Sequence, residues 1–421
     1  MTNEQKRRQI ARKKKLRRRR KQRRAILMLL VIVALLVLGF SLLKDGDRDA
    51  VNEPETLPVE IDAPTPEAAV EPTMEPAVEV TLAPTPVPTP DPTPEPTPEP
   101  TLPPEEITLT FVGDCTLGGD MKGPSEGAFF SRVSASGEID YEYCFKNVRS
   151  IFEEDDYTVV NLEVVLTNSS NYNTSIPGKI YIFRGKPSYV KMLTSSSVEL
   201  ANIANNHMTD FSEAGIEETI SYLEKENIGY FGYGRTWYEE IHGMTVGFVG
   251  INTWTTKTED MRATIKEVRA NSDICIVNCH WGSELVYEAT QTQKDIAHMA
   301  VDLGADLVIG HHPHVVNGIE VYKGVNIIYS LGNFCFGGKA NPKDKDTFIY
   351  QHTFTVQNGE VLGEDFDIIP CKITSVPDES YNNYQPTPVT GEKAQAIFSK
   401  IYRYSKVFPE TISFKRFQEE E

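Results

Sequence analysis

The sequence has 421 residues, of which 42 are Lys or Arg, 60 are Asp or Glu and 40% are hydrophobic, a composition typical of globular rather than fibrous proteins. The charge is unevenly placed, because residues 1–24 hold 14 of the basic residues and a single acid. The rest of the chain is acidic overall, and an apolar segment typical of a transmembrane helix directly follows the basic residues. We therefore expect no nucleic-acid partner.

Residues 25–43 predict one transmembrane helix, because 19 consecutive residues without a charge can cross about 30 Å of hydrocarbon. A cleaved secretory signal is the alternative, but small residues usually follow its apolar region, whereas Leu42, Leu43 and Lys44 follow here. The basic tail, residues 1–24, then predicts a cytoplasmic N-terminus, with the C-terminal domain outside the cell membrane. This tail either contacts the lipid bilayer through anionic headgroups or serves only as a topology signal.

Residues 44–106 predict a disordered linker rich in Pro, Glu and Thr. They contain 17 of the 27 prolines and 16 acidic residues against two basic ones. Such a composition cannot form a core, and it favours an extended chain that rises about 3.1 Å per residue. We expect a semi-rigid stalk that separates the folded domain from the membrane.

Residues 107–370 predict a layered α/β domain, because short apolar runs alternate with helical patterns. The expected buried strands are residues 107–112, 157–161, 198–204, 245–251, 274–278, 306–310 and 327–331. One helix is expected from a Ser212 cap to Glu226, and another from a Thr290 and Gln293 capping box to Gly304. Residues 371–421 form a C-terminal extension that packs on the domain or trails it, with a peripheral helix over 392–404.

Residues with metal-binding and catalytic side chains follow the predicted strands. Because the carboxyl ends of strands in α/β sheets converge, these side chains are expected to meet in one crevice. Five of the eight histidines fall in these segments. The predicted metal ligands are Asp114, Glu163, Asn206, His207, His280, His312 and His314.

The segment from His311 to His314 gives the most specific local prediction. Pro313 disfavours a helical conformation at His312, and alternate residues of an extended chain point the same way. His312 and His314 should therefore face one ion. His311 should point elsewhere and form a structural hydrogen bond.

The ligand types indicate one or two divalent ions, namely Mn, Zn or Fe, because nitrogen and oxygen donors are abundant and thiolates are absent. Glu163 is the simplest bridge between two ions, at a spacing of about 4 Å. We predict that Asp114 and His207 are catalytic, His207 as a general acid toward the leaving group. The six cysteines show no disulfide framework, and most are expected to be buried free thiols.

Two basic residues, Lys179 and Arg184, are candidates for substrate binding, because they lie near a turn before Pro187. A guanidinium there can bind a carboxylate or phosphate through two hydrogen bonds. Both residues can equally be surface charges.

The residues also carry a resemblance to a known family, through GDCTLGGD (113–120), NLE (161–163), ANNHMTD (204–210), CHWGSE (279–284), GADLVIGHHPH (304–314) and IIYSLGNF (327–334). This series resembles the CapA family of poly-γ-glutamate capsule synthesis proteins, whose domain is similar to calcineurin-like metallophosphoesterases. The resemblance implies a four-layered α/β/β/α sandwich. It also implies poly-γ-glutamate or a related anionic polymer, together with membrane capsule-synthesis subunits, as partners.

The phosphoesterase pattern matches this chain position by position, with two departures. Asp114 resembles the first metal aspartate, Glu163 stands in place of the bridging aspartate, and the other ligands match the Asn-His pair, the lone His and the final His-x-His. That pattern has a histidine where this chain has Thr116, so one metal site lacks a ligand. The capsule family commonly has a glycine where this chain has Ser212.

Three functions are consistent with these observations. The first is membrane-anchored capsule biosynthesis, in which an extracellular metal-dependent domain takes part in the synthesis, export or anchoring of poly-γ-glutamate. The second is a surface metal-dependent phosphoesterase or other hydrolase. The third is a non-enzymatic assembly subunit that binds the polymer. The sequence leaves open whether the protein is an enzyme.

Overall fold

The computed structural model describes residues 103–413, which form part of one compact unit. The predicted basic tail, the transmembrane helix at 25–43 and almost all of the predicted linker lie outside this range. Within 103–413, no helix is both long and apolar enough to cross a membrane. The first strand, β1 (Glu105–Thr116), includes the last two residues of the predicted linker.

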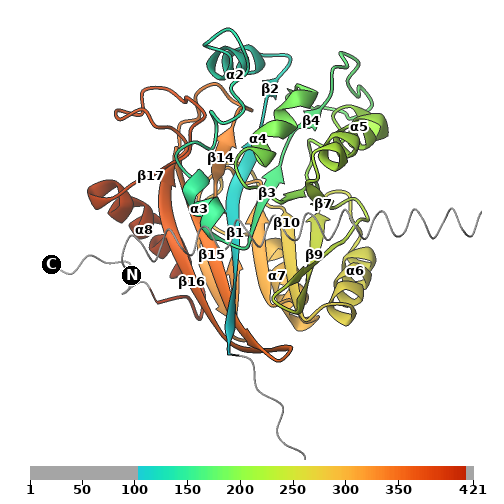
Figure 1. The fold of residues 1–421 in the computed structure, drawn as a ribbon, viewed down its shortest axis with the longest axis vertical. Helices are drawn as coiled ribbons and strands as arrows, with labels where there is room; N and C mark the ends of the chain where they lie inside the picture. The colour runs from blue at the N-terminus through green and yellow to red at the C-terminus, as the bar shows by residue number, and fades with distance from the viewer. Residues whose placement is uncertain (1–102, 414–421) are drawn as a thin grey trace, which may run out of the picture. The chain divides into compact units, whose positions relative to one another are not determined.

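Two large sheets form the centre of the fold (Figure 1). The first has the order β17-β16-β15-β1-β3-β6-β7, and β14 also pairs with β1. Its other strands are β3 (Tyr157–Leu162), β6 (Leu200–Asn202), β7 (Gly229–Phe231), β14 (Asn333–Phe336), β15 (Asp346–Gln357), β16 (Glu360–Lys372) and β17 (Thr387–Pro388).

The second sheet has the order β12-β13-β11-β10-β9-β8. Its strands are β8 (Trp237–Ile241), β9 (Met244–Asn252), β10 (Ile274–His280), β11 (Leu307–His311), β12 (Ile319–Tyr322) and β13 (Val325–Ile328). A small third sheet contains β2 (Gly119–Asp120), β5 (Phe183–Gly185) and β4 (Val165–Leu166). All seven predicted strand segments contain a strand, so the α/β class is confirmed.

Parallel pairing brings the carboxyl ends of strands together in both large sheets. In the first sheet β1, β3, β6 and β7 are mutually parallel neighbours. In the second, β9, β10, β11 and β13 are parallel in the same way. Each sheet therefore delivers several strand ends, and the loops that follow them, to one edge.

Eight helical segments surround the sheets within residues 103–413. They are α2 (Ser125–Val133), α3 (Arg149–Glu154), the 3₁₀ turn η1 (Pro187–Tyr189), α4 (Val190–Thr194), α5 (Ser212–Lys225), α6 (Thr258–Ala270), α7 (Gln291–Asp302) and α8 (Gly391–Ser405). The predicted Thr290 and Gln293 capping box at the start of α7 is confirmed. The predicted C-terminal helix is α8, which buries Ile397 and Ile401 in the core between the sheets.

Three hydrophobic clusters fill the spaces between the layers. On β1, the alternate residues Ile107, Leu109 and Phe111 face the second sheet, as the two-residue period of a strand requires. The opposite face of the first sheet packs against α3, α4 and α5, and the outer face of the second sheet packs against α6 and α7. The layers thus run helix, sheet, sheet, helix.

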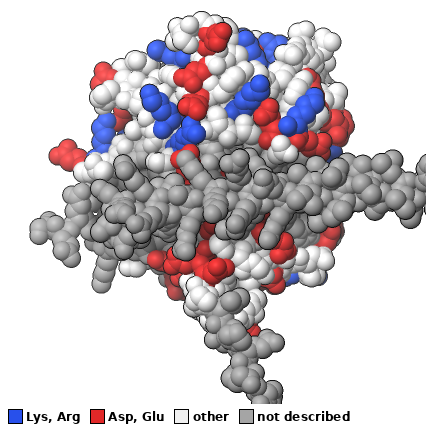
Figure 2. All heavy atoms as spheres, viewed as in Figure 1, with Lys and Arg blue, Asp and Glu red and all other residues white. Residues whose placement is uncertain are grey.

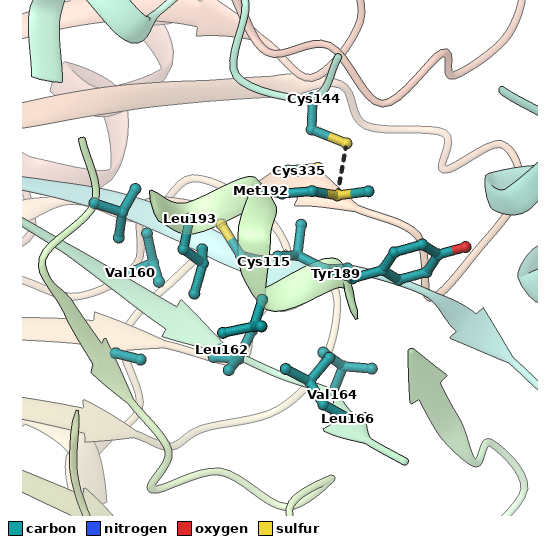
Figure 3. Close-up of a cluster of buried hydrophobic side chains, with 14 of the residues drawn as sticks. Cys115, Cys144, Val160, Leu162, Val164, Leu166, Tyr189, Met192, Leu193 and Cys335 are labelled. Carbon is teal, nitrogen blue, oxygen red and sulfur yellow. Dashed lines mark hydrogen bonds between the residues drawn. The ribbon is translucent and has the colours of Figure 1, made fainter. Parts of the chain in front are cut away.

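Several sulfur-containing side chains lie in the hydrophobic cluster between the first sheet and helices α3, α4 and α5. Figure 3 shows Cys115, Cys144, Cys335 and Met192 near one another, with Cys144 Sγ 3.8 Å from Met192 Sδ. All six cysteines, which fall within residues 103–413, are buried and free. The prediction of buried free thiols is confirmed, and burial raises the pKa of the Cys115 thiol, so that it stays protonated and unreactive.

The start of α5 differs from the predicted Ser212 cap. Phe211 occupies the N-cap position, without a capping side-chain hydrogen bond, and Ser212 is the first helical residue. Ser212 has a φ of 59°, in the left-handed region that glycine adopts without strain. The local backbone therefore has the conformation that the family's glycine favours.

We expect Ser212→Gly to raise the free energy of unfolding by about 0.5–1 kcal/mol. The gain comes from relief of left-handed strain, roughly 1–2 kcal/mol, minus the extra freedom of glycine in the unfolded chain. Urea titration gives the measurement. The control is Ala214→Gly at an exposed position of the same helix, which should instead lower stability. A loss of stability in both variants would contradict the argument.

Candidate metal centre

The candidate site lies where strand ends of both large sheets meet. Asp114 is near the end of β1, Glu163 directly follows β3, and His280 is the last residue of β10. Asn206 and His207 lie in the loop between β6 and α5, and His312 and His314 lie in the loop after β11. Residues up to 200 positions apart in the sequence are thus brought to one place.

Among residues 103–413, two groups of side chains have ligand atoms close enough to hold an ion, with every atom of a group within 4.8 Å of the others. Glu163, His280 and His312 form the first group, and Asp114, Glu163 and His314 form the second. Glu163 belongs to both groups, as expected of a bridging carboxylate.

Glu163 shows best that the cluster fits a cation. Its side chain is fully buried, and neither carboxylate oxygen has a hydrogen-bond partner among residues 103–413. Burial raises the pKa of Glu163 well above its usual value. A buried carboxylate without partners is costly, and a bound divalent ion would supply the missing charge.

The imidazoles around Glu163 surround one of its oxygens. Glu163 Oε1 lies 3.5 Å from His280 Nε2, 3.8 Å from His314 Nε2 and 3.9 Å from His207 Nε2. Asn206 joins this arrangement, because its Oδ1 lies 2.9 Å from His280 Nε2. Nitrogen and oxygen donors of this kind suit Mn, Fe or Zn, so the residues present fit one or two divalent ions.

Asp114 is held by a set of donors on both of its oxygens. Asn161 Nδ2 donates to Oδ1 at 2.8 Å, and the backbone N–H of His312 donates to Oδ2 at 3.3 Å. His314 Nδ1 lies 3.0 Å from Oδ2. Burial alone would raise the pKa of Asp114, but the imidazoles of His311 and His314 outweigh it and hold the pKa well below its usual value.

His207 is oriented by a buried aspartate. Its Nδ1 lies 2.8 Å from Asp210 Oδ2, and its ring stacks on Phe183 with 3.7 Å between ring centroids. This contact turns Nε2 toward Glu163. Burial lowers the pKa of His207, so its neutral form, with Nδ1–H donating to Asp210, predominates near neutral pH.

The conformation predicted for the His311–His314 segment is wrong. His312 has a φ of 96° and His314 a φ of 57°, so the segment is not extended. Tertiary hydrogen bonds override the local preference before proline: Asp114 accepts from the His312 N–H, and the Pro313 carbonyl accepts from Leu285 N–H at 2.8 Å. His312 and His314 consequently belong to different ligand groups instead of facing one ion.

The two predicted substrate-binding residues have protein partners. Lys179 Nζ donates to the Asn206 carbonyl at 2.6 Å and pairs with the Asp210 carboxylate, so it lies beside the candidate metal centre. Arg184 forms a double hydrogen bond with Glu126, at 2.8 and 3.1 Å, and so has a structural role. Substrate binding by either residue stays a prediction.

Sequence reasoning missed several residues that contact the ligands. Asn161 and Asp210 orient Asp114 and His207, and their signal was their place inside the NLE and ANNHMTD motifs. Trp254, with 51% of its surface exposed, packs its ring 4.5 Å from that of His312. No local pattern distinguishes Trp254, because it reaches the site from the loop after β9.

The fold and the cluster together define an α/β sandwich protein with a candidate dinuclear metal centre at its strand ends. The chain belongs to the family described as bacterial capsule synthesis protein PGA_cap, whose family model matches residues 108–338. The predicted family membership is confirmed.

Named relatives agree with this family. The capsule biosynthesis protein CapA of Bacillus anthracis is 29% identical over 327 residues, which are 71% of this chain and 72% of that protein. The PGA biosynthesis protein CapA of Bacillus subtilis (strain 168) is 30% identical over 253 residues, which are 55% of this chain and 63% of that protein. A solved putative 5′-nucleotidase from Staphylococcus aureus is 14% identical with a TM-score of 0.40, covering 71% of this chain and 58% of that one.

Proposed function

We propose that this protein acts in the synthesis, export or anchoring of poly-γ-glutamate, through a metal-dependent domain held outside the cell by residues 25–43. Family membership and the names of the two CapA relatives support the polymer. The buried, unpartnered Glu163 carboxylate between two ligand groups supports the metal dependence. Membrane capsule-synthesis subunits are the proposed partners.

The side chains of the site would have different chemical roles. Divalent ions would supply Lewis acidity and an activated water there. His207, oriented by Asp210, presents an unprotonated Nε2 to the cluster, where it can accept a proton from the activated water and then return that proton to the leaving group. The exposed ring of Trp254 beside His312 offers a surface on which a substrate chain can pack.

The net charge of the protein disfavours an anionic polymer, so such a polymer would have to bind where basic side chains are exposed. The formal net charge of the whole chain is −18, which repels a polyanion at long range. Figure 2 shows lysines and arginines side by side with acidic residues over the upper part of the visible face. Basic side chains are therefore present on that face despite the acidic balance.

A metal-dependent phosphoesterase or other hydrolase is the second candidate, and the paired ligand groups favour it. A non-enzymatic polymer-binding subunit is the third. Thr116 favours the third candidate, because its hydroxyl donates to the Glu163 carbonyl at 3.2 Å and does not replace an imidazole ligand. Hydrolysis of phosphate mono- and diesters with Mn, Zn or Fe tests the second candidate directly.

Gene deletion with complementation tests the proposal in an encapsulated host. Deletion is expected to abolish secreted or cell-retained poly-γ-glutamate, measured as polymer in the medium and on washed cells. His312→Ala should fail to restore it, because one ligand group loses an imidazole. His298→Ala is the matched control and should restore it, because His298 pairs with Glu320 outside the cluster.

Two outcomes would contradict the proposal in different ways. Unchanged polymer after deletion would remove the capsule role. Full restoration by His312→Ala, at wild-type protein levels, would remove the metal dependence and favour the assembly subunit. Immunoblots of the membrane fraction give the protein levels.

A further inference from the structure

A further imidazole faces the Asp114 side of the cluster. His311 is the last residue of β11, and only 2% of its surface is exposed. Its Nδ1 lies 3.5 Å from Asp114 Oδ1, yet it has no hydrogen-bond partner among residues 103–413. A buried ring nitrogen without a partner is costly, as for the Glu163 oxygens, and a cation would satisfy both.

The sheet register explains why His311 points into the site. His280 and His311 are direct partners in the parallel pair of β10 and β11. Side chains at paired positions of neighbouring strands lie on the same face of a sheet. Since His280 points toward Glu163, His311 projects from the same face, and the Trp281 N–H, which donates to the His311 carbonyl at 3.1 Å, fixes its backbone.

Without His311, the two ligand groups differ in their number of protein donors. The Glu163, His280 and His312 group gains Asn206 as a fourth protein donor, through its Oδ1 beside His280. The Asp114, Glu163 and His314 group has no such fourth donor from Thr116, whose hydroxyl donates to the Glu163 carbonyl.

We propose that His311, whose Nδ1 approaches Asp114, supplies the nitrogen ligand that Thr116 does not, by turning toward an ion that Asp114, Glu163 and His314 would hold. This inference rests on the metal dependence in the proposed function. It assigns His311 a place in the first coordination sphere instead of the structural hydrogen bond expected from the sequence. His311 and His314 would then bind one ion and His312 the other.

Metal binding to the purified full chain tests this assignment without an activity assay. Wild-type protein is stripped with chelator, and Mn²⁺ uptake is followed by calorimetry and by elemental analysis after dialysis. His311→Gln is expected to retain one ion and to bind the second at least about tenfold more weakly, since even indirect partners of a metal change affinity by that factor. His298→Gln, outside the cluster, should bind both ions as wild type does.

A second variant gives a positive signal. His311→Cys, loaded with Co²⁺, is expected to show a thiolate-to-cobalt charge-transfer absorption, which His298→Cys should lack. Circular dichroism of each variant shows that the fold is retained.

The outcomes separate the two proposals. Two ions bound by His311→Gln at unchanged affinity, with no charge-transfer band in His311→Cys, would overturn the assignment of His311 alone. A wild-type chain that takes up no ion would overturn the metal dependence as well.

Discussion

Glu163→Gln is expected to make the metal-free protein more stable and to abolish its stabilisation by metal. The carboxyl group is buried without a hydrogen-bond partner and burial raises its pKa well above the usual value, so its replacement by a neutral amide of the same size removes the cost of ionising it there. We expect a gain of about 1–3 kcal/mol in the free energy of unfolding without metal. Wild-type protein should instead gain about 2.7 kcal/mol for each site at a metal concentration of 100 times Kd.

The measurement is thermal unfolding of both proteins, with chelator and with Mn²⁺. The matched control is Glu320→Gln, because Glu320 is also buried but accepts a hydrogen bond from Tyr329 Oη at 2.6 Å and contacts His298. That variant should lose stability and keep its response to metal. An unchanged metal response in Glu163→Gln would show that Glu163 does not bridge ions.

Asp210→Asn is expected to destabilise the protein strongly and to impair His207. Asp210 is fully buried, where it pairs with Lys179, contacts His207 Nδ1 and accepts the Phe183 N–H at 2.6 Å. Removing the charge leaves the largely buried Lys179 ammonium unpaired, which costs roughly 3–5 kcal/mol. Lys179→Met should cost less, because Asp210 keeps its other two contacts.

A double-mutant cycle in urea measures the coupling. The double variant should lose less stability than the sum of the two single variants, since no unpaired charge remains in it. Asp302→Asn, which breaks the exposed pair with Lys323, is the control and should change stability little. Additive effects of the Lys179 and Asp210 substitutions would contradict a buried ion pair.

The sequence predicted the parts of the fold that depend on local patterns. The capping box of α7 and the seven strand segments need only nearby residues, and each was identified. The long hairpin of β15 and β16 was missed although a signal exists, because Asn358 and Gly359 adopt the positive φ values typical of a tight hairpin turn.

The sequence indicated which side chains lie at the candidate site, but not how these side chains are divided into two ligand groups. Position after a strand indicated which side chains would lie near one another, because strand ends converge in any α/β sheet. The division of His312 and His314 between two groups depends on hydrogen bonds with Asp114, which accepts, and Leu285, which donates, and both residues are distant in sequence. For the same reason His311 was expected to face away from the cluster, whereas the register of β10 and β11 turns it inward.

The origin of the ligands has a consequence for the mechanics of the domain. Asp114 and Glu163 come from strands of the first sheet, whereas His280, His312 and His314 come from the second sheet and its loop. An ion held by both groups would join the two halves of the sandwich at the end opposite the β15–β16 turn. Resistance of the halves to sliding or splaying would then depend on ligation, and the concentration of available cation would set the rigidity of the whole domain.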